Sequence, residues 1–487
     1  MTRKRPSGHR QSFRGGPGRL PDYRRRRMAT LASYADRLDA HLADLAGQHG
    51  VPGAVCGVLS DDETAIATCG VANVATRVEV TPDTLFQIGS ITKLYTTTLL
   101  LQAEAAGIVS LDEPVRAQLQ EFSVADPGAT IEITPRHLLT HSCGIEGDHL
   151  IDTGWNDDAL ARYVATLAPL RQIHPTDEAY SFCNTGFGVA GRLLEVATGE
   201  HFDRVLRRRL ARPLGCVSTI TLPQHAMLQR VAAGHLHVPG ETARRQARWS
   251  LTRSNGPMGG VMAPASEVLA FARLHLEEGR AADGSDLLPP AAVAEMQQPQ
   301  VESPFPGEEQ ALGWTVRRWG SLTCLGQDAD TIGQRAFLRV VPQRHFAMCV
   351  LTNSAPGAAL GRELIRRVAA DLLDVDGSHA PAVPPSSASP SAADVADRYA
   401  GSYERLHQRI EVTPGPQGLA LAIQPSGVLG ALGVDPVSIT LRTLDPETGA
   451  FVGTDPLTGA DEIVAFSGDR DGARGLYLAG RLHRRID

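Results

Sequence analysis

Predicted strands lie at both ends of the first three quarters of this chain, and predicted helices lie between them. Short apolar or alternating runs that predict strands occupy residues 54–59, 64–69, 313–319, 336–341 and 346–352. Residues 110–260 read mainly as helices and loops, with clear helical periodicity over 185–198 and 266–276. This order predicts one sheet built from the two ends, with a helical insertion. Helices are also expected over roughly 29–48 and 358–373, before and after the strands.

The length and local composition divide the chain further. With 487 residues the chain is too long for one compact core. Residues 376–394 are rich in Pro, Ser and Ala, which is typical of a linker. Beyond it, short alternating runs at 409–413 and 419–423 predict a small antiparallel β-domain over 395–487. Residues 1–27 are rich in Arg and poor in apolar residues, so a disordered basic tail is expected before a main domain over 28–375.

Overall charge and cysteine usage exclude several function classes. The net charge of −7 gives no indication of nucleic-acid binding, and no apolar run is long enough for a membrane span. The seven cysteines are scattered and form no C-x-x-C pair, so neither a zinc site nor any other cofactor is predicted. Free thiols in a reducing compartment fit this pattern best, and the predicted location is cytoplasmic.

A serine and a lysine stand three residues apart in Ser90-Ile-Thr-Lys93, at the head of an apolar helical stretch. Residues at i and i+3 lie on one face of a helix, so the lysine amine is expected within reach of the serine hydroxyl. A buried lysine loses its charge readily and then serves as a base that activates the serine. The alternative is an exposed helix start with a capping serine and a solvated lysine.

Several other stretches carry a family resemblance in the same order along the chain. They are Val51-Pro-Gly-Ala54, Thr84-Leu-Phe-Gln-Ile-Gly-Ser90, His137-Leu-Leu-Thr-His-Ser-Cys-Gly144, Ser181-Phe-Cys-Asn-Thr-Gly186, and Asp330-Thr-Ile-Gly-Gln334 onward to Leu351-Thr-Asn353. From about residue 40 to 373 the chain resembles the serine β-lactamase and DD-peptidase superfamily, on the side of class C β-lactamases and related esterases. The resemblance implies an α+β fold, an antiparallel sheet flanked by helices. The C-terminal domain resembles the barrel-like or lipocalin-like appendages of such hydrolases.

The resemblance also implies acyl transfer through a covalent enzyme. Ser90 would attack a carbonyl, Lys93 would accept its proton, and Asn184 would hydrogen-bond both Lys93 and the substrate. The backbone amides of Ser90 and of a later strand near Asp330 would form the oxyanion hole.

The sequence departs from the family pattern at two positions. Phe182 stands where a tyrosine is expected, and Gln327-Asp328-Ala329 replaces a segment that begins with Lys or His. Neither Phe nor Gln titrates near neutral pH, so efficient β-lactam hydrolysis is not expected. Tyr180 is either a substitute source of the phenol or an aromatic packing residue.

Other polar residues near these motifs are weaker candidates. His141 is expected to be a structural hydrogen-bonding residue. Asp148 and His149 either line the cleft or face water. Cys183 has no predicted partner as a nucleophile, so a buried thiol is expected.

The sequence thus predicts a serine hydrolase or acyltransferase that takes a small-molecule or peptidyl acyl substrate through an ester, amide or thioester. One alternative is a peptide-cyclising or acyl-transferring biosynthetic enzyme of the same fold. The other is a catalytically silent homologue that binds an acylated ligand.

Overall fold

The structure, a computed structural model, describes residues 31–236, 243–249, 251–378, 398–415, 418–426, 436–445, 449–469 and 472–487. The predicted basic tail over 1–27 and residues 379–394 of the predicted linker lie outside the described residues. Predictions for those segments therefore stay predictions.

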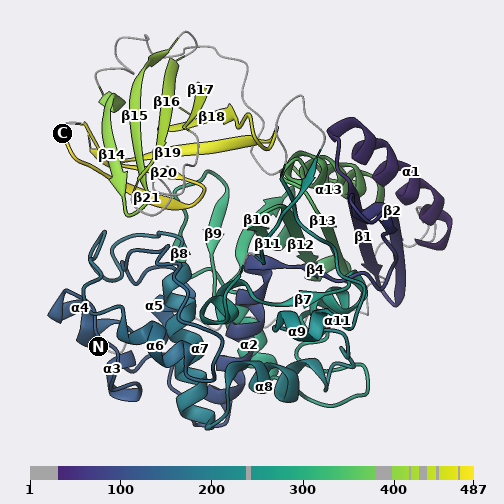
Figure 1. Ribbon diagram of the computed structural model, residues 1–487, viewed down its shortest axis with the longest axis horizontal. Helices are drawn as coiled ribbons and strands as arrows, with labels where there is room; N and C mark the ends of the chain where they lie inside the picture. The colour runs from purple at the N-terminus through teal and green to yellow at the C-terminus, as the bar shows by residue number, and fades with distance from the viewer. Residues whose placement is uncertain are drawn as a thin grey trace, which may run out of the picture.

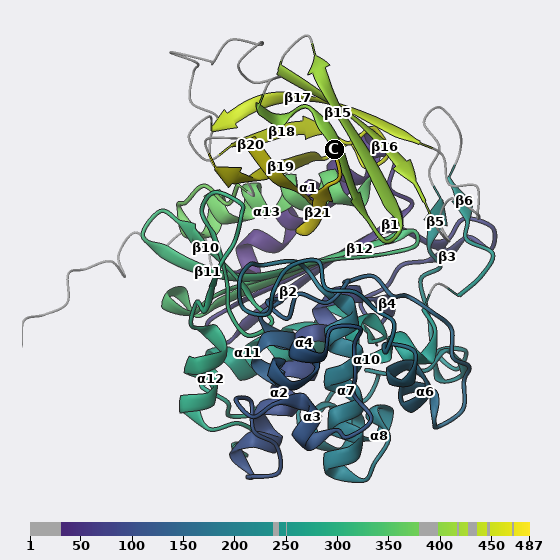
Figure 2. The ribbon, with the colours of Figure 1, turned by 90° about the vertical axis from the view of Figure 1, so that its left-hand side faces the viewer.

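A nine-stranded antiparallel sheet forms the middle of the larger part of the molecule (Figure 2). In spatial order its strands are β3 (Val78–Glu79), β2 (Glu63–Asn73), β1 (Gly53–Ser60), β13 (Phe346–Thr352), β12 (Gln334–Val341), β11 (Leu322–Thr331), β10 (Thr315–Trp319), β9 (Glu308–Gln310) and β8 (Val301–Glu302). The central pair joins the two ends of the domain, because β1 pairs with β13 from Ala54 opposite Thr352 to Ser60 opposite Phe346. The prediction of a sheet built from both ends is confirmed.

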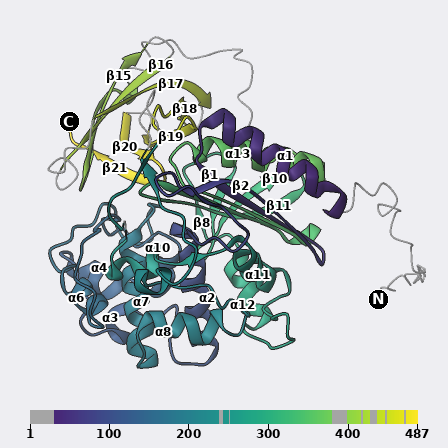
Figure 3. The same cartoon turned by 45° about the vertical axis from the view of Figure 1, so that its right-hand side comes forward.

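The central strands are apolar on both faces because helices cover both faces (Figure 3). Along β1, Cys56 and Val58 pack in the core shared with α1 (Leu31–His49) and α13 (Gly357–Leu373). The alternate residues Val55 and Leu59 pack in the core shared with the helical insertion. Because successive side chains of a strand point to opposite faces, the residues of β1 contribute alternately to the two cores.

The helical insertion covers the other face of the sheet (Figures 2 and 3). Its helices are α2 (Thr92–Ala105), α3 (Val115–Gln118), α4 (Pro127–Glu132), α5 (Pro135–Leu139), α6 (Ala159–Ala165), α7 (Asn184–Thr198), α8 (Phe202–Leu206), α9 (Pro223–Ala226), α10 (Gly256–Gly259), α11 (Ala265–Leu276) and α12 (Pro290–Gln297). Two short strand pairs accompany them, β4 (Phe86–Gln87) with β7 (Met262–Ala263) and β5 (His235–Leu236) with β6 (Arg244–Arg245). Among the described residues, no helix has the length and apolar character needed to cross a bilayer.

Helix α2 runs through the middle of this insertion, although it carries several hydroxyl groups. Thr97 and Thr98 are fully buried, and their hydroxyls donate to the carbonyl oxygens of Lys93 and Leu94. These bonds to the preceding turn satisfy the buried polar groups within the helix itself. The helix therefore tolerates complete burial, which places Lys93 in its first turn away from water.

The C-terminal part forms a closed barrel of eight antiparallel strands (Figure 1). The strands are β14 (Gly401–Arg405), β15 (Gln408–Gly415), β16 (Gly418–Pro425), β17 (Val437–Asp445), β18 (Ala450–Thr454), β19 (Asp461–Asp469), β20 (Gly472–Leu478) and β21 (Arg481–Arg485). Pairing of Tyr403 with Arg485 closes the ring, and alternate apolar residues such as Ile410 and Val412 fill it. The prediction of a small antiparallel β-domain is confirmed.

The alternation patterns did not predict one strand that matters for the site, although the family resemblance places a strand near Asp330. Strand β11 contains Gln327, Asp328 and Asp330, which interrupt the apolar alternation that predicts a strand. Pairing with β12 nevertheless runs from Leu325 opposite Val340 to Thr331 opposite Gln334. The polar residues sit at the end of the strand that faces a cavity, where apolar side chains are not required.

Candidate active site

Ser90 lies in a single 3-10 turn, Gly89–Ile91, immediately before α2. Lys93 occupies the first turn of α2, and its Nζ is 2.9 Å from Ser90 Oγ. Ser90 is 9% exposed and Lys93 is fully buried. The structure therefore brings the two residues together as their spacing predicts, and the solvated-lysine alternative is wrong.

The surroundings of the Lys93 amine fit its neutral form. Besides Ser90, Nζ contacts Asn184 Oδ1 at 2.7 Å and the carbonyl oxygen of Met258 at 2.9 Å. Both oxygens only accept, so they take the two N–H groups of a neutral amine. A neutral amine then keeps its lone pair for the hydroxyl of Ser90, whereas a protonated amine donates its third N–H to Ser90 Oγ. Met258 was not foreseen, since a backbone acceptor leaves no signal in the sequence.

Burial, first of all, lowers the pKa of Lys93 to about 7, and the positive charge of Arg481 acts in the same direction. Negative charge at Asp148 and Asp330, and the thiol of Cys183, oppose this effect on the pKa. A lysine with such a pKa is half unprotonated near neutral pH, which a general base requires.

Asn184 is the first residue of α7, and its two amide atoms have different partners. Its Oδ1 accepts from Lys93, and its Nδ2 donates to Asp148 Oδ1 at 2.7 Å. A carboxylate accepts only, so Asp148 fixes which way the carboxamide faces. The predicted neighbour of Lys93 is therefore present and oriented by a third residue.

The end of β11 lies beside the turn that carries Ser90. Strand β10 pairs with β11 only as far as Thr315 opposite Gly326, so residues 327–331 pair with β12 alone among the described strands. The Ser90 turn packs against this stretch. Gly89 has a φ of +49°, and a Cβ there would lie 3.2 Å from the Asp330 carbonyl oxygen. The backbone of Gly89 is thus close to that of Asp330, and the predicted oxyanion hole between Ser90 and this stretch stays a prediction.

The departures from the family pattern lie where the motifs place them. The Phe182 ring centroid is 4.7 Å from Lys93 Nζ, so no hydroxyl is present beside the amine on this side. Gln327 is buried in the cavity wall, and its Nε2 donates to the Asp328 carbonyl at 3.1 Å. The Asp328 carboxylate pairs with Arg339.

Tyr180 packs against the barrel. Its ring is buried in an apolar cluster with Tyr477 and Leu482, and burial raises its pKa well above the usual range. It lines the cavity that contains Ser90, yet no described hydrogen bond joins its hydroxyl to Ser90 or Lys93. This arrangement favours the aromatic-packing alternative.

The weaker candidates make structural contacts. His141 Nδ1 accepts from the backbone N–H of Cys183 at 2.9 Å, and burial holds the pKa of His141 well below its usual range. Cys183 is a buried thiol that caps α7 through the N–H of Gly186, with Cys143 Sγ 3.7 Å away. His149 Nε2 lies 3.0 Å from the Thr166 hydroxyl.

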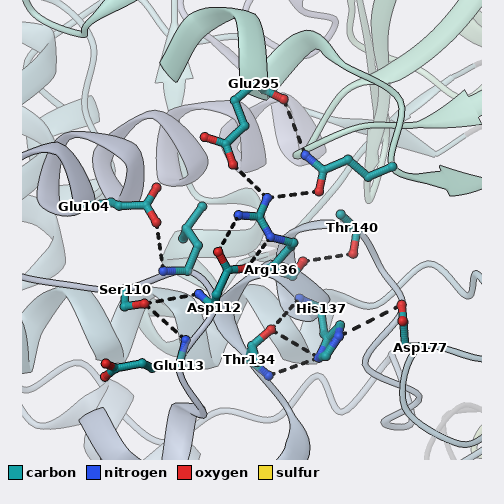
Figure 4. A network of polar contacts seen from close by, with 12 residues as sticks. Glu104, Ser110, Asp112, Glu113, Thr134, Arg136, His137, Thr140, Asp177 and Glu295 are labelled. Atoms are coloured by element: carbon teal, nitrogen blue, oxygen red, sulfur yellow. Dashed lines mark hydrogen bonds and ion pairs between the residues drawn. The ribbon is translucent and has the colours of Figure 1, made fainter. Parts of the chain in front are cut away.

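The loop that carries Asp148 begins at α5, which is firmly held (Figure 4). Arg136 makes two hydrogen bonds to the Asp112 carboxylate and an ion pair of 2.9 Å with Glu295. Thr134 and His137 cap the helix reciprocally. The network ties α5 to α12 and to the segment after α2, so the loop after α5 starts from a fixed point.

The barrel reaches into this site, which the sequence did not indicate. Asp148 Oδ2 pairs with Arg405 and with Arg481 Nε, the latter at 2.8 Å. Although burial acts to raise it, these arginines and Asn184 hold the pKa of Asp148 well below its usual range. Of the two sequence alternatives for Asp148, neither is correct, because its carboxylate joins the two domains. Arg405 and Arg481 lie 257 and 333 residues away from Asp148 in the chain, so no local sequence pattern predicts these two contacts.

A cavity of about 470 Å³ lies between the barrel and the sheet, with Ser90 in its wall. Gln327, Asp330 and Arg481 line it near Ser90, while Phe305 and Leu457 line it farther along the two domains. The predicted site residues Ser90, Tyr180, Phe182, Gln327, Asp328 and Asp330 all contribute to this wall. Among the described residues, no cluster of His, Cys, Asp and Glu suits a metal ion.

Comparison with known proteins gives consistent results. The β-lactamase family profile matches residues 38–373. Penicillin-binding protein 4 of Amycolatopsis lactamdurans is 38% identical over 380 residues, which are 77% of this chain and 97% of that protein. The acyltransferase calJ of Penicillium decumbens is 27% identical over 47% of this chain and 60% of that protein.

The likeness to solved structures includes the barrel. The crystal structure of SurE superposes with a TM-score of 0.72 and 26% identity, covering 94% of this chain and all of that chain. A second structure of SurE was determined with D-Leu, and its TM-score is 0.67. The profile match, the penicillin-binding relative and the shared two-part architecture show that this chain belongs to the β-lactamase family.

Proposed function

We propose that this protein is a serine hydrolase or acyltransferase that forms an acyl-Ser90 intermediate with Lys93 as base. The observation that carries the proposal is the fully buried Lys93 amine, whose Nζ lies 2.9 Å from Ser90 Oγ and is held there by two acceptor oxygens. The acyl donor is an ester, amide or thioester, because each presents the carbonyl carbon that such a serine attacks.

The chemical steps follow from these contacts. As Ser90 Oγ bonds to the carbonyl carbon, its proton passes to Lys93 Nζ, and the carbonyl oxygen becomes an oxyanion held by the amides of Ser90 and Asp330. The oxyanion then collapses, the bond to the leaving group breaks, and Lys93 returns the proton to the departing atom. Water or an amine then attacks the carbonyl carbon of the acyl-serine and transfers its proton to Lys93. The bond from that carbon to Ser90 Oγ breaks, Lys93 returns the proton to Oγ, and the product leaves.

The missing phenol favours good leaving groups. Phe182 offers no hydroxyl to carry the proton from Lys93 to a departing amine, and a general acid of this kind typically contributes about 10²–10⁴-fold. A thiol leaves as a thiolate with a pKa of about 8.5, which needs far less protonation than an amine. Thioesters and activated esters are therefore the preferred donors of this proposal, and β-lactams the poorest.

Acyl transfer to an amine is the second candidate, and the cavity favours it. Its volume of about 470 Å³ holds more than a small ester, so an acceptor amine has room beside the acyl group. A SurE structure with D-Leu shows that a relative binds an amino acid. Mass analysis of products formed with and without D-leucine as added acceptor distinguishes transfer from hydrolysis.

Labelling tests the nucleophile directly. A fluorophosphonate probe is expected to add one equivalent to the wild-type protein, measured by intact mass, and none to Ser90→Ala. Ser181→Ala is the matched control, because Ser181 is a buried serine nearby whose hydroxyl accepts from the backbone N–H of Leu482. Labelling that persists in Ser90→Ala contradicts the proposal. An unlabelled wild type supports the silent homologue that binds an acylated ligand.

A further inference from the structure

A continuous set of polar contacts runs from the barrel to the Lys93 amine. Arg405 and Arg481 bind one oxygen of Asp148, and the other oxygen accepts from Asn184. Asn184 in turn accepts from Lys93. Two residues, Asp148 and Asn184, therefore connect the barrel to the proposed base, although the barrel lies in a separate part of the chain.

The hairpin between β20 and β21 makes this approach possible. Its two turn residues, Ala479 and Gly480, have φ values of +49° and +79°, which are typical of a tight two-residue turn. The Gly480 carbonyl accepts from the N–H of Phe182 at 2.9 Å, and a Cβ on Gly480 would lie 3.3 Å from Phe182 Cβ. Close backbone contact thus seats the hairpin beside Phe182 and delivers Arg481, the next residue, to the site.

Two cations contact the same aromatic ring. The Phe182 ring centroid is 4.7 Å from Lys93 Nζ and 4.6 Å from Arg481 Cζ. In a region shielded from water, a permanent guanidinium charge this close opposes a second positive charge on Lys93. Phe182 has no hydroxyl with which to compensate either charge.

The other charged or titratable groups around Lys93 act on its pKa in the opposite direction or not at all. Asp148, after α5, and Asp330, on β11, favour a protonated Lys93, as does the Cys183 thiol before α7. His141 is neutral and adds no charge. Arg481 is the cation from the barrel that opposes them, and after burial it has the largest influence on the pKa of Lys93.

We propose that the barrel completes the active site, with Arg481 opposing protonation of the base and Asp148 as the residue that positions Asn184 toward it. Both are positioning residues, since they act through Lys93 and Asn184. The inference rests on the proposed function and deepens it: the β-domain is part of the machinery for acylation.

The rate of Ser90 acylation by the fluorophosphonate probe, measured against pH, tests the role of Arg481. In the wild-type protein the rate is expected to rise through a midpoint near pH 7, where Lys93 loses its proton. In Arg481→Gln the pKa of Lys93 rises, so the midpoint moves up by about one pH unit. The rate at pH 7 then falls about fivefold, while the plateau at high pH is kept.

Two controls separate charge from packing. Arg481→Lys keeps the positive charge, so its midpoint is expected to stay at the wild-type value. Ser181→Ala removes an uncharged hydrogen bond between the same two domains, and its midpoint is also expected to stay. Thermal unfolding confirms that each variant is folded, and Arg481→Met replaces the Gln variant if that one is not.

Asp148→Asn tests the positioning role. Without the carboxylate the orientation of Asn184 is no longer fixed, so the plateau rate is expected to fall about tenfold. The midpoint does not rise, because a negative charge that favoured protonated Lys93 is gone.

The outcomes are distinguishable from a failure of the proposed function. An unlabelled wild-type protein overturns the function itself. A labelled wild type whose midpoint is unchanged in Arg481→Gln, or equally raised in Arg481→Lys, overturns the role of the Arg481 charge. An unchanged plateau in Asp148→Asn overturns the role of Asp148.

Discussion

At the scale of single residues, Lys93 lacks the water that normally surrounds a lysine ammonium. Every contact of its amine is to protein, and the Phe182 ring covers another side. Burying a charged amine is costly, so the neutral form is favoured and the pKa falls to about 7. Burial therefore gives Lys93 the neutral form that the proposed role as a base requires.

Phe182→Tyr is expected to increase acylation by esters and amides about tenfold. The ring already lies 4.7 Å from Lys93 Nζ, so the added hydroxyl is placed to carry a proton to the leaving group. The measurement is the single-turnover rate with p-nitrophenyl and anilide substrates. Phe305→Tyr, which adds a hydroxyl elsewhere on the cavity wall, is the control. Equal rates in wild type and Phe182→Tyr would show that Lys93 protonates the leaving group unaided.

At the scale of elements, the end of β11 that extends beyond β10 and the turn before α2 together form the candidate site. Residues 327–331 continue past the end of β10, and the Gly89–Ile91 turn fills the space that another strand would occupy. Beyond Gly326, the edge of β11 away from β12 therefore has no strand beside it among the described residues. The geometry depends on how closely Gly89 approaches Asp330.

Gly89→Ala is expected to lower acylation at least tenfold, because a Cβ at 3.2 Å from the Asp330 carbonyl forces the turn away from β11. The rate of probe labelling and the thermal midpoint are the measurements. Gly107→Ala is the matched control, since Gly107 also has a positive φ, of +68°, but open space around it. Both substitutions strain the backbone by about 1 kcal/mol, so comparable activity losses would refute the contact argument.

At the scale of the whole molecule, the sheet carries two helical layers and the barrel lies beside β8 and β9, over the cavity (Figure 1). The cavity wall comes from both domains. Substrate size is therefore set by how the two domains dock, and a larger side chain on the barrel wall narrows the space without touching Ser90.

Leu457→Trp is expected to lower kcat/KM several-fold for donors with a long acyl chain and to leave p-nitrophenyl acetate unaffected. Leu457 is a half-exposed barrel residue on the cavity wall, so an indole there reduces the volume available. Ile486→Trp, at a similarly exposed barrel position outside the cavity lining, serves as control. Equal losses for short and long donors would show that the acyl chain does not occupy this end.

Much of the fold follows from local patterns. The periodicity of residues 185–198 corresponds to α7, that of 266–276 to α11, and the alternation at both ends to β1 and β13. The alternation patterns did not predict strand β11, because its polar end lines a cavity, where burial no longer selects apolar residues. Only the family resemblance placed a strand near Asp330.

The sequence by itself determined the proposed nucleophile and its neighbour, because Ser90 and Lys93 are three residues apart where a 3-10 turn leads into α2, and this local geometry brings the two side chains together. Only the tertiary structure decided which charged groups surround Lys93 and so influence its pKa. Asp148 and Arg481 are 333 residues apart in the chain, and they are in contact because the barrel docks on the larger domain. Residues that are far apart in the chain can thus influence each other's charge at short distance, and no local sequence spacing predicts such a contact.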